Sequence, residues 1–270
     1  MVDNLNRYQQ IIERIFTQTY TQGMREVPFK REDIEIAARA LDITLPKNIS
    51  DVLYSFRFRS PLPASVQRTA PVHERWVIEL AGHGAYRFKL KPESAVEILP
   101  NLLLAETKVP DATPGIVAMY ALSDEQALLA KMRYNRLIDL FTRINCYSLQ
   151  NHLRTTVPGY GQVETDEIYI GVDRQGVHYA IPVQAKGGRD RLGIVQIEQD
   201  VALCTHKFPN LVCRPIAAQF MAGDLIALFE FEVTEDSVAI IAEKHYRLVP
   251  PKSVTVDDLK AYRQRPDEEQ

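Results

Sequence analysis

The sequence has little of what marks several common classes of protein. Its three cysteines, Cys146, Cys204 and Cys213, are odd in number and lack C-x-x-C spacing, which argues against a disulfide framework and a zinc site. No apolar run approaches the roughly 20 residues that a membrane span requires, and the N-terminal residues lack a signal-peptide core. We therefore expect a cytoplasmic protein with no membrane partner.

Common catalytic sequence motifs are missing as well. The six histidines are scattered without H-E-x-x-H spacing, no G-x-S-x-G elbow occurs, and Gly82-His83-Gly84 does not match a phosphate loop or a dinucleotide fingerprint. The net charge of −3 and the pI near 6.1 do not indicate a nucleic-acid-binding protein. They do not exclude one, because phosphate binding needs only a local basic patch.

The length of 270 residues, with 46% hydrophobic residues, allows one large domain or two small ones. Helical spacing of apolar residues predicts helices over 4–22, 31–41 and 49–58, and two strands, 76–80 and 86–90, flank a Gly-rich turn. Three helices followed by a β-hairpin is the order of a winged helix, so we predict a winged-helix-like DNA-binding domain over residues 1–91. Dimerisation modules and structural modules share this order and stay open as alternatives.

Basic residues of the third helix and the hairpin would suit contacts to DNA phosphates. They are Lys47, Arg57, Arg59, Arg68, Arg87, Lys89 and Lys91. The competing interpretation is an ordinary solvated basic face.

Prolines at 92, 100, 110 and 114 place a linker over residues 92–122, in which 96–105 and 116–122 are apolar enough to pack. The C-terminal domain then covers residues 123–270. Ser123 and Gln126 have capping-box spacing at the start of a helix predicted to run to Ile144. The elements expected after it are a strand over 146–157, a hairpin, a helix capped by Asp190, strands over 211–220, 225–233 and 238–249, and a frayed charged tail over 263–270.

The hairpin within residues 163–188 carries the chemistry. Its apolar runs, 167–172 and 177–185, are joined by Asp173-Arg174-Gln175-Gly176. Gln184 and Lys186 are two residues apart and share a strand face, beside acids that enter the first strand. Pairing of Val172 with Val177 would put Glu167 on the Gln184 face, and a slip of one residue would bring Asp166 there instead.

An acid at the start of one strand, an apolar strand ending in acid-x-Lys and then a helix resembles the core of the PD-(D/E)XK nuclease superfamily, which includes many type II restriction enzymes. Gln184-Ala185-Lys186 has Gln where that pattern usually has Asp or Glu, and Gln-x-Lys variants occur among active members. The resemblance implies an α/β (α+β) fold whose restriction-endonuclease-like αβββαβ core, with a mixed sheet, covers residues 123–270.

The resemblance also implies roles for individual residues. Asp166 would be the carboxylate ligand of Mg²⁺, with Mn²⁺ as a substitute, and Gln184 and the carbonyl of Ala185 would be further ligands. Lys186 would position a water molecule or help to deprotonate it. Glu167 is the second candidate for the metal carboxylate, and Glu164 and Glu125 are possible accessory acids. A solvated hairpin end with ordinary ion pairs is the alternative without function.

The function expected from these features is Mg²⁺-dependent hydrolysis of phosphodiester bonds in double-stranded DNA, as in a type II restriction endonuclease. A homodimer is expected because one active centre cuts one strand. Arg154 shares a strand face with His152 and Gln150 and could reach DNA, and Arg189 and Arg191 open a helix that could hold a phosphate. The alternatives are a non-catalytic DNA-binding or interaction protein that keeps the nuclease fold, and a junction-resolving or repair nuclease.

Overall fold

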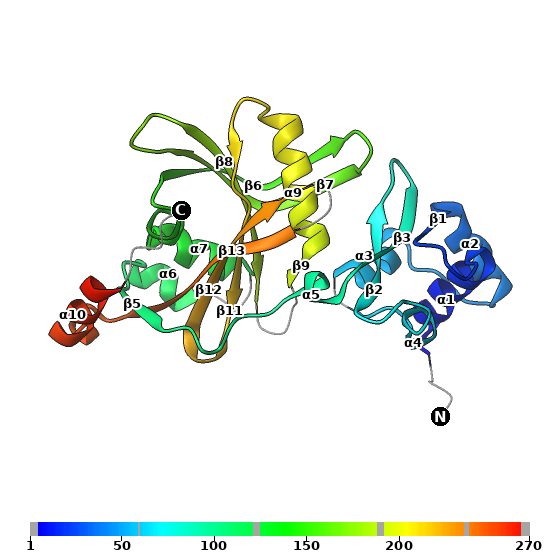
Figure 1. Cartoon of the computed structure of the whole chain (residues 1–270), viewed down its shortest axis with the longest axis horizontal. Coiled ribbons are helices and arrows are strands. Elements are labelled where there is room, and N and C mark those ends of the chain that lie inside the picture. The colour runs from blue at the N-terminus through cyan, green and yellow to red at the C-terminus, as the bar shows by residue number, and fades with distance from the viewer. Residues whose placement is uncertain (1–4, 59, 121–124, 188–191, 235–237, 266–270) are drawn as a thin grey trace. The chain divides into compact units, whose positions relative to one another are not determined.

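The computed structural model of the chain describes residues 5–58, 60–120, 125–187, 192–234 and 238–265 (Figure 1). Contacts between residues divide the chain into two units, and both are built from separate stretches of sequence. The N-terminal unit takes Met1–Ile98, Arg154–Glu164 and Asp190–His206. The C-terminal unit takes Leu99–Leu153, Thr165–Arg189 and Lys207–Gln270. Two segments of the predicted nuclease domain are therefore part of the N-terminal unit.

The N-terminal unit contains the three predicted helices and the predicted hairpin. The helices are α1 (Arg7–Thr19), α2 (Arg31–Ala40) and α3 (Ser50–Phe58), and the hairpin is β2 (Glu74–Leu80) with β3 (Ala85–Pro92). Helix α1 begins where it does because the Asn6 side chain accepts the backbone N–H groups of Tyr8 and Gln9. These elements were recognisable because their apolar residues recur at one clear period.

Two elements of this unit were not predicted. Strand β1 (Glu26–Lys30) pairs with β3 and gives a three-stranded antiparallel sheet of order β1-β3-β2, and α4 (Ala64–Gln67) follows the Pro-rich bend. Pro28 argues against a strand, but β1 is an edge strand, where proline is tolerated. Val27 and Phe29 point inward on its alternating pattern.

The core of the N-terminal unit forms where α1 packs on this sheet. Phe16 lies with its ring 5.1 Å from the ring of Trp76 and 5.1 Å from that of Phe88, both in edge-to-face geometry. Such aromatic pairs add to the free energy of burial. Trp76 is 1% exposed and is the chain's only tryptophan.

Within the described residues, the C-terminal unit is organised on an eight-stranded sheet of order β5-β13-β12-β11-β8-β7-β6, with β10 also paired to β8. The strands of the sheet are β5 (Glu106–Pro110), β6 (Asn145–Val157), β7 (Gly161–Val172), β8 (His178–Lys186), β10 (Val212–Cys213), β11 (Ile216–Phe220), β12 (Leu225–Val233) and β13 (Val238–Val249). The end of β6 and the start of β7, within Arg154–Glu164, belong to the N-terminal unit. Strand β8 runs antiparallel to β7 but parallel to β11. The sheet is therefore mixed, as predicted, and the chain is of mixed α and β class.

Two helices cover one face of this sheet where one helix was predicted. They are α7 (Glu125–Tyr134) and α8 (Leu137–Thr142), and Arg136 between them has a φ of 50°. The Asn135 side chain ends α7 by accepting Ala112 N–H and donating to Lys131 O. The break turns the helix, so Leu140, predicted to be buried, is 52% exposed. Ser123, the predicted cap, lies outside the described residues.

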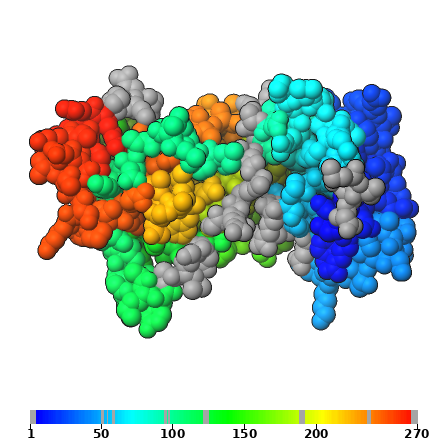
Figure 2. Space-filling view, turned by 90° about the horizontal axis from the view of Figure 1, so that it is seen from below, coloured from blue at the N-terminus to red at the C-terminus, as the bar shows by residue number. Residues whose placement is uncertain are grey.

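The segment 92–122 contains short elements rather than a packed linker. They are α5 (Glu93–Val96), β4 (Glu97–Ile98), which pairs with β9 (Leu192–Gly193), then β5 and α6 (Gly115–Tyr120). The prediction that its apolar stretches are buried is wrong for most of their residues, because Leu102, Leu103, Ile116 and Met119 are 65–94% exposed. The green atoms of this region stand out on the surface in Figure 2.

The remaining described α-helices are α9 (Ile194–Lys207) and a C-terminal helix, α10 (Val256–Gln264), that was not predicted, and two short 3-10 helices are η1 (Ala222–Asp224) and η2 (Pro251–Ser253). Helix α9 buries Ile194, Ile197 and Cys204 as expected, whereas Val201, predicted to be buried, is half-buried. Asp190, the predicted cap, lies outside the described residues. Thr255 caps the N-terminus of α10, because its side chain accepts Asp258 N–H. Among the described residues, no helix has both the length and the apolar character needed to cross a bilayer.

The three cysteines are free thiols in different environments. Cys146 is 6% exposed and Cys204 is 1% exposed, whereas Cys213 is half-buried. Burial, reinforced by the nearby Asp139 carboxylate, raises the pKa of the Cys146 thiol to about 11, and only the thiolate is reactive.

We expect a native-state titration with Ellman's reagent at pH 8 to label one cysteine, Cys213, quickly. The fast signal should vanish in Cys213→Ser, and its persistence there would contradict the assignment.

Candidate functional site

The register of the β7–β8 hairpin decides which acid accompanies Gln184. The strands pair from Val172 with His178 to Glu167 with Val183, one residue away from a Val172–Val177 pairing. A three-residue loop causes the shift, since Asp173 N–H donates to Val177 O and Gly176 adopts a φ of 84°.

This register puts Asp166 on the same face as Gln184. Glu167 and Val183 are directly opposed, so the next residues of the two strands, Asp166 and Gln184, point to the other face together with Lys186. The sequence had left Asp166 and Glu167 as alternatives, and the structure places only Asp166 beside Gln184.

Asp166 is also hydrogen-bonded to the second strand. Its Oδ2 accepts the backbone N–H of Ala185 at 2.8 Å, just beyond the last pair of the ladder. The carboxylate therefore lies against the Gln184-Ala185-Lys186 segment. Asp166 is half-buried, Gln184 is 2% exposed and Lys186 is 8% exposed. Burial of an amide and an ammonium group is costly unless a polar partner or a ligand compensates it.

Glu167 lies on the opposite face, where it contacts α7. Its Oε1 accepts a hydrogen bond from Arg133 Nε at 3.0 Å, lies 2.9 Å from Arg133 Nη2 in an ion pair, and also accepts the Ser148 hydroxyl of β6. Glu167 is 0% exposed. The nearby Tyr169 hydroxyl has a raised pKa because of burial and the Glu167 charge. Glu167 thus holds a helix to the sheet with a buried ion pair, away from Gln184.

The face with Asp166 offers hard oxygen donors. A carboxylate, the Gln184 amide oxygen and the Ala185 carbonyl are the ligand types that Mg²⁺ takes, with water completing its octahedron. The described residues contain no cluster of three or more His, Cys, Asp or Glu side chains suited to a metal. The predicted ligand set, Asp166, Gln184 and Ala185, contains a single carboxylate. Binding of Mg²⁺ by this set would therefore depend on one carboxylate, one amide and one carbonyl oxygen.

The other acids considered from sequence have separate positions. Glu164 forms an ion pair with Arg154, whose Nε donates to Glu164 Oε2 at 2.8 Å, so the positive charge of Arg154 is partly neutralised. Glu125 opens α7 and is half-buried. The role of accessory acid stays a prediction for both residues.

The predicted DNA contacts of the N-terminal unit are mostly engaged within the protein. Nε and Nη2 of Arg57 are buried, and this residue lines a cavity of about 170 Å³ with Trp76 and Ile194. Arg59, Arg189 and Arg191 lie outside the described residues.

The basic residues of the hairpin surround an acid that was not considered. Glu79 is 7% exposed. It accepts Arg87 Nε at 3.0 Å and Nη2 at 2.8 Å, lies 3.2 Å from Lys91 Nζ and is 3.9 Å from Lys89 Nζ. Arg87, Lys89 and Lys91 therefore surround a buried carboxylate, and each also has a second acidic partner, Glu26 or Glu198. Their contact with DNA phosphates stays a prediction.

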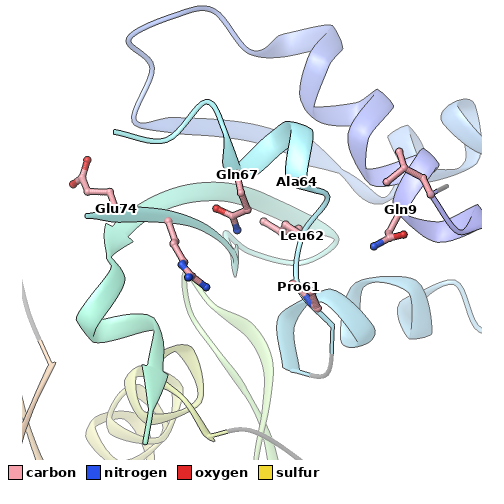
Figure 3. Close-up of a pocket in the computed structure, with 8 residues that line it drawn as sticks. Gln9, Pro61, Leu62, Ala64, Gln67 and Glu74 are labelled. Carbon is pink, nitrogen blue, oxygen red and sulfur yellow. The ribbon is translucent and has the colours of Figure 1, made fainter. Parts of the chain in front are cut away.

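A larger hollow of about 570 Å³ also lies in the N-terminal unit, between the start of α1, the bend before α4 and β2 (Figure 3). Its polar side chains have structural partners. Gln67 bonds both backbone groups of Trp76, and Glu74 pairs with Arg25. These contacts fix the fold of the unit and leave no grouping of acid and base suited to catalysis among the described lining residues.

Comparison with known proteins adds no family. No family model, no curated protein and no solved structure matches this chain. The functional argument therefore depends on the geometry at Asp166, Gln184 and Lys186.

Proposed function

We propose that the chain is a Mg²⁺-dependent endonuclease acting on double-stranded DNA, with Asp166, Gln184, Ala185 and Lys186 as its active centre. The observation that carries the proposal is the hairpin register, which brings Asp166 to the face of Gln184 and Lys186 and bonds its carboxylate to Ala185 N–H. An acid, an amide and a lysine on one strand face match the pattern by which the sequence resembles PD-(D/E)XK nucleases.

The residues divide the work as follows. Asp166, the Gln184 amide oxygen and the Ala185 carbonyl would hold the cation, which when bound polarises the phosphodiester and acidifies water. Lys186, fixed on the inner strand β8, would orient the attacking water and stabilise the negative charge that develops on the phosphate. A neutral Gln184 makes a weaker cation site than a carboxylate, so we expect a high metal requirement.

The N-terminal unit supports a role on DNA through its topology. Helix α1, strand β1, helices α2 and α3 and the β2–β3 hairpin occur in the order of a winged-helix-like module, with the one-turn helix α4 before the hairpin. Because the hairpin cations Arg87, Lys89 and Lys91 are paired with Glu79, Glu26 and Glu198, we propose that this unit orients DNA with its helices. A homodimer would supply one centre per DNA strand, and the three free thiols suit a reducing, cytoplasmic setting.

A non-catalytic DNA-binding protein is the second candidate, and Gln184 is the observation that favours it. Loss of an acid from the usual acid-x-Lys pair weakens metal binding while the fold is kept. A junction-resolving or repair nuclease would use the same chemistry on a different DNA shape.

The decisive experiment compares wild type with Lys186→Ala on plasmid and phage DNA. We expect Mg²⁺ or Mn²⁺ to support cleavage by wild type, EDTA to abolish it and Lys186→Ala to reduce it by at least about a hundredfold, within the usual range for a lost proton-transfer group. Lys252→Ala, at an exposed position, is the matched control and should cleave like wild type. Salt-sensitive DNA binding without cleavage by wild type would favour the non-catalytic protein.

A further inference from the structure

A cluster of exposed polar residues lies in the C-terminal unit where α7 meets the edge strand β6. Arg133 Nη2 donates to Asn151 Oδ1 at 3.2 Å, and Gln126 Nε2 lies 3.0 Å from His152 Nε2. All four side chains are exposed, and the proposed catalytic centre uses none of them. Arg133 also ties α7 to the sheet through Glu167.

A buried carboxylate holds the cluster in place. Arg133 is gripped by Glu167, which is 0% exposed and also accepts Ser148, while 39% of the Arg133 side chain remains exposed. A guanidinium fixed by a buried carboxylate loses little conformational freedom when it binds a ligand. The neighbouring Asn151 is positioned by that guanidinium in turn.

The backbone at His152 is shaped to present its side chain. His152 has a φ of 49°, in the left-handed region that non-glycine residues seldom adopt, inside a 13-residue strand. Such an irregularity re-aims a side chain and interrupts an edge that would otherwise pair with another strand. Residues 147–152 are all exposed, on both faces of the strand.

The chemistry of the cluster suits base edges better than phosphates. Phosphate oxygens only accept hydrogen bonds, whereas Gln126 brings an amide acceptor and the Arg133 charge is already matched by Glu167. Base edges in the major groove offer donors and acceptors together, and Arg, Asn and Gln are the side chains that read them. The major groove also admits a helix or a two-stranded ribbon.

We propose that Gln126, Arg133, Asn151 and His152 read base edges of duplex DNA and so set the sequence preference of the protein. The inference rests on the proposed action on DNA. It places the specificity-determining residues on α7 and β6, whereas the proposed catalytic residues are on β7 and β8.

The test is selection of bound duplexes from a randomised-sequence library in EDTA, followed by sequencing. The variants are Gln126→Ala, Asn151→Ala and His152→Gly, the last because glycine keeps the left-handed backbone. We expect each to lose about tenfold of the base preference at one or two positions, with unchanged binding to bulk DNA. Gln175→Ala, exposed in the β7–β8 loop, should keep the wild-type preference.

The outcomes separate this inference from the nuclease proposal. If the variants keep the wild-type consensus while wild type cleaves DNA, the base-reading inference is overturned and the nuclease stands. If the variants lose the base preference but wild type never cleaves DNA, the base-reading inference is supported and the protein is a non-catalytic DNA-binding protein. Wild type that binds no duplex DNA would overturn both. Circular dichroism of each variant confirms that it is folded.

Discussion

Replacing Asp166 with Asn is expected to slow metal-dependent cleavage of duplex DNA by at least about a hundredfold, a loss of about 2.7 kcal/mol in transition-state stabilisation. Asp166 is the carboxylate on the face with Gln184 and Lys186, and asparagine of the same size removes its charge. The side chain is half-buried, so the fold should tolerate the change. Initial rates of plasmid nicking across a Mg²⁺ and Mn²⁺ titration measure the effect.

The matched control is the adjacent acid. Glu167→Gln alters the buried pair with Arg133 and should lower the free energy of unfolding by about 2 kcal/mol, the scale of a charged hydrogen bond lost in the interior. The folded variant should still cleave within about threefold of wild type. If Glu167→Gln were inactive while Asp166→Asn stayed active, the two acids would have exchanged roles and the hairpin face would be misassigned.

The largest expected effect on stability lies in the N-terminal unit, at Glu79. Burial raises the pKa of this carboxyl, but Lys91, Arg87 and Lys89 together lower it below its ordinary value. Glu79→Gln would remove the central anion and leave those cations with only their outer partners, Glu26 and Glu198. We expect a loss of about 3 kcal/mol, as for other buried ion pairs broken on one side. Fluorescence of Trp76, the chain's only tryptophan, reports unfolding of this unit in a urea titration.

Acid should reproduce part of that loss in the wild type. A carboxyl whose pKa is lowered by folding stabilises the protein at any pH above its unfolded pKa, and this contribution disappears as the pH falls through its folded pKa. The Trp76 transition should therefore shift to lower urea below about pH 4.5, and less so in Glu79→Gln. Glu26→Gln is the control, because Glu26 is 3.6–3.7 Å from Arg87 and Lys89 and its side chain is 48% exposed. An exposed pair of this kind contributes under about 1 kcal/mol, so equal effects at both positions would contradict the network.

Elements with a single strong period could be predicted from the sequence, and elements decided by tertiary contacts could not. The helices α1 and α2 and the strands around Gly82-His83-Gly84 are of the first kind. Strand β1 was hidden by Pro28, whose place at a sheet edge is known only once β3 is beside it. The break at Arg136 depends on Asn135 accepting Ala112 N–H from a distant segment.

The sequence was enough to predict which residues form the candidate site, but not which of them share one face of the sheet. Gln184 and Lys186 share a face by alternation alone. The choice between Asp166 and Glu167 depended on one loop residue, since a left-handed Gly176 makes a three-residue loop and moves the register by one. Side-chain partners on neighbouring strands could not be predicted from the sequence either, and the cations that surround Glu79 are an example.

The alternation of the chain between its two units has a consequence for biosynthesis. The stretches Arg154–Glu164 and Asp190–His206 complete the unit that Met1–Ile98 begins. During translation the first hundred residues leave the ribosome early, yet their unit lacks its last helix until residue 206 has been made. A nascent chain halted before that point should be sensitive to protease and dependent on chaperones, and for the same reason a truncated gene should not yield either unit as an independent protein.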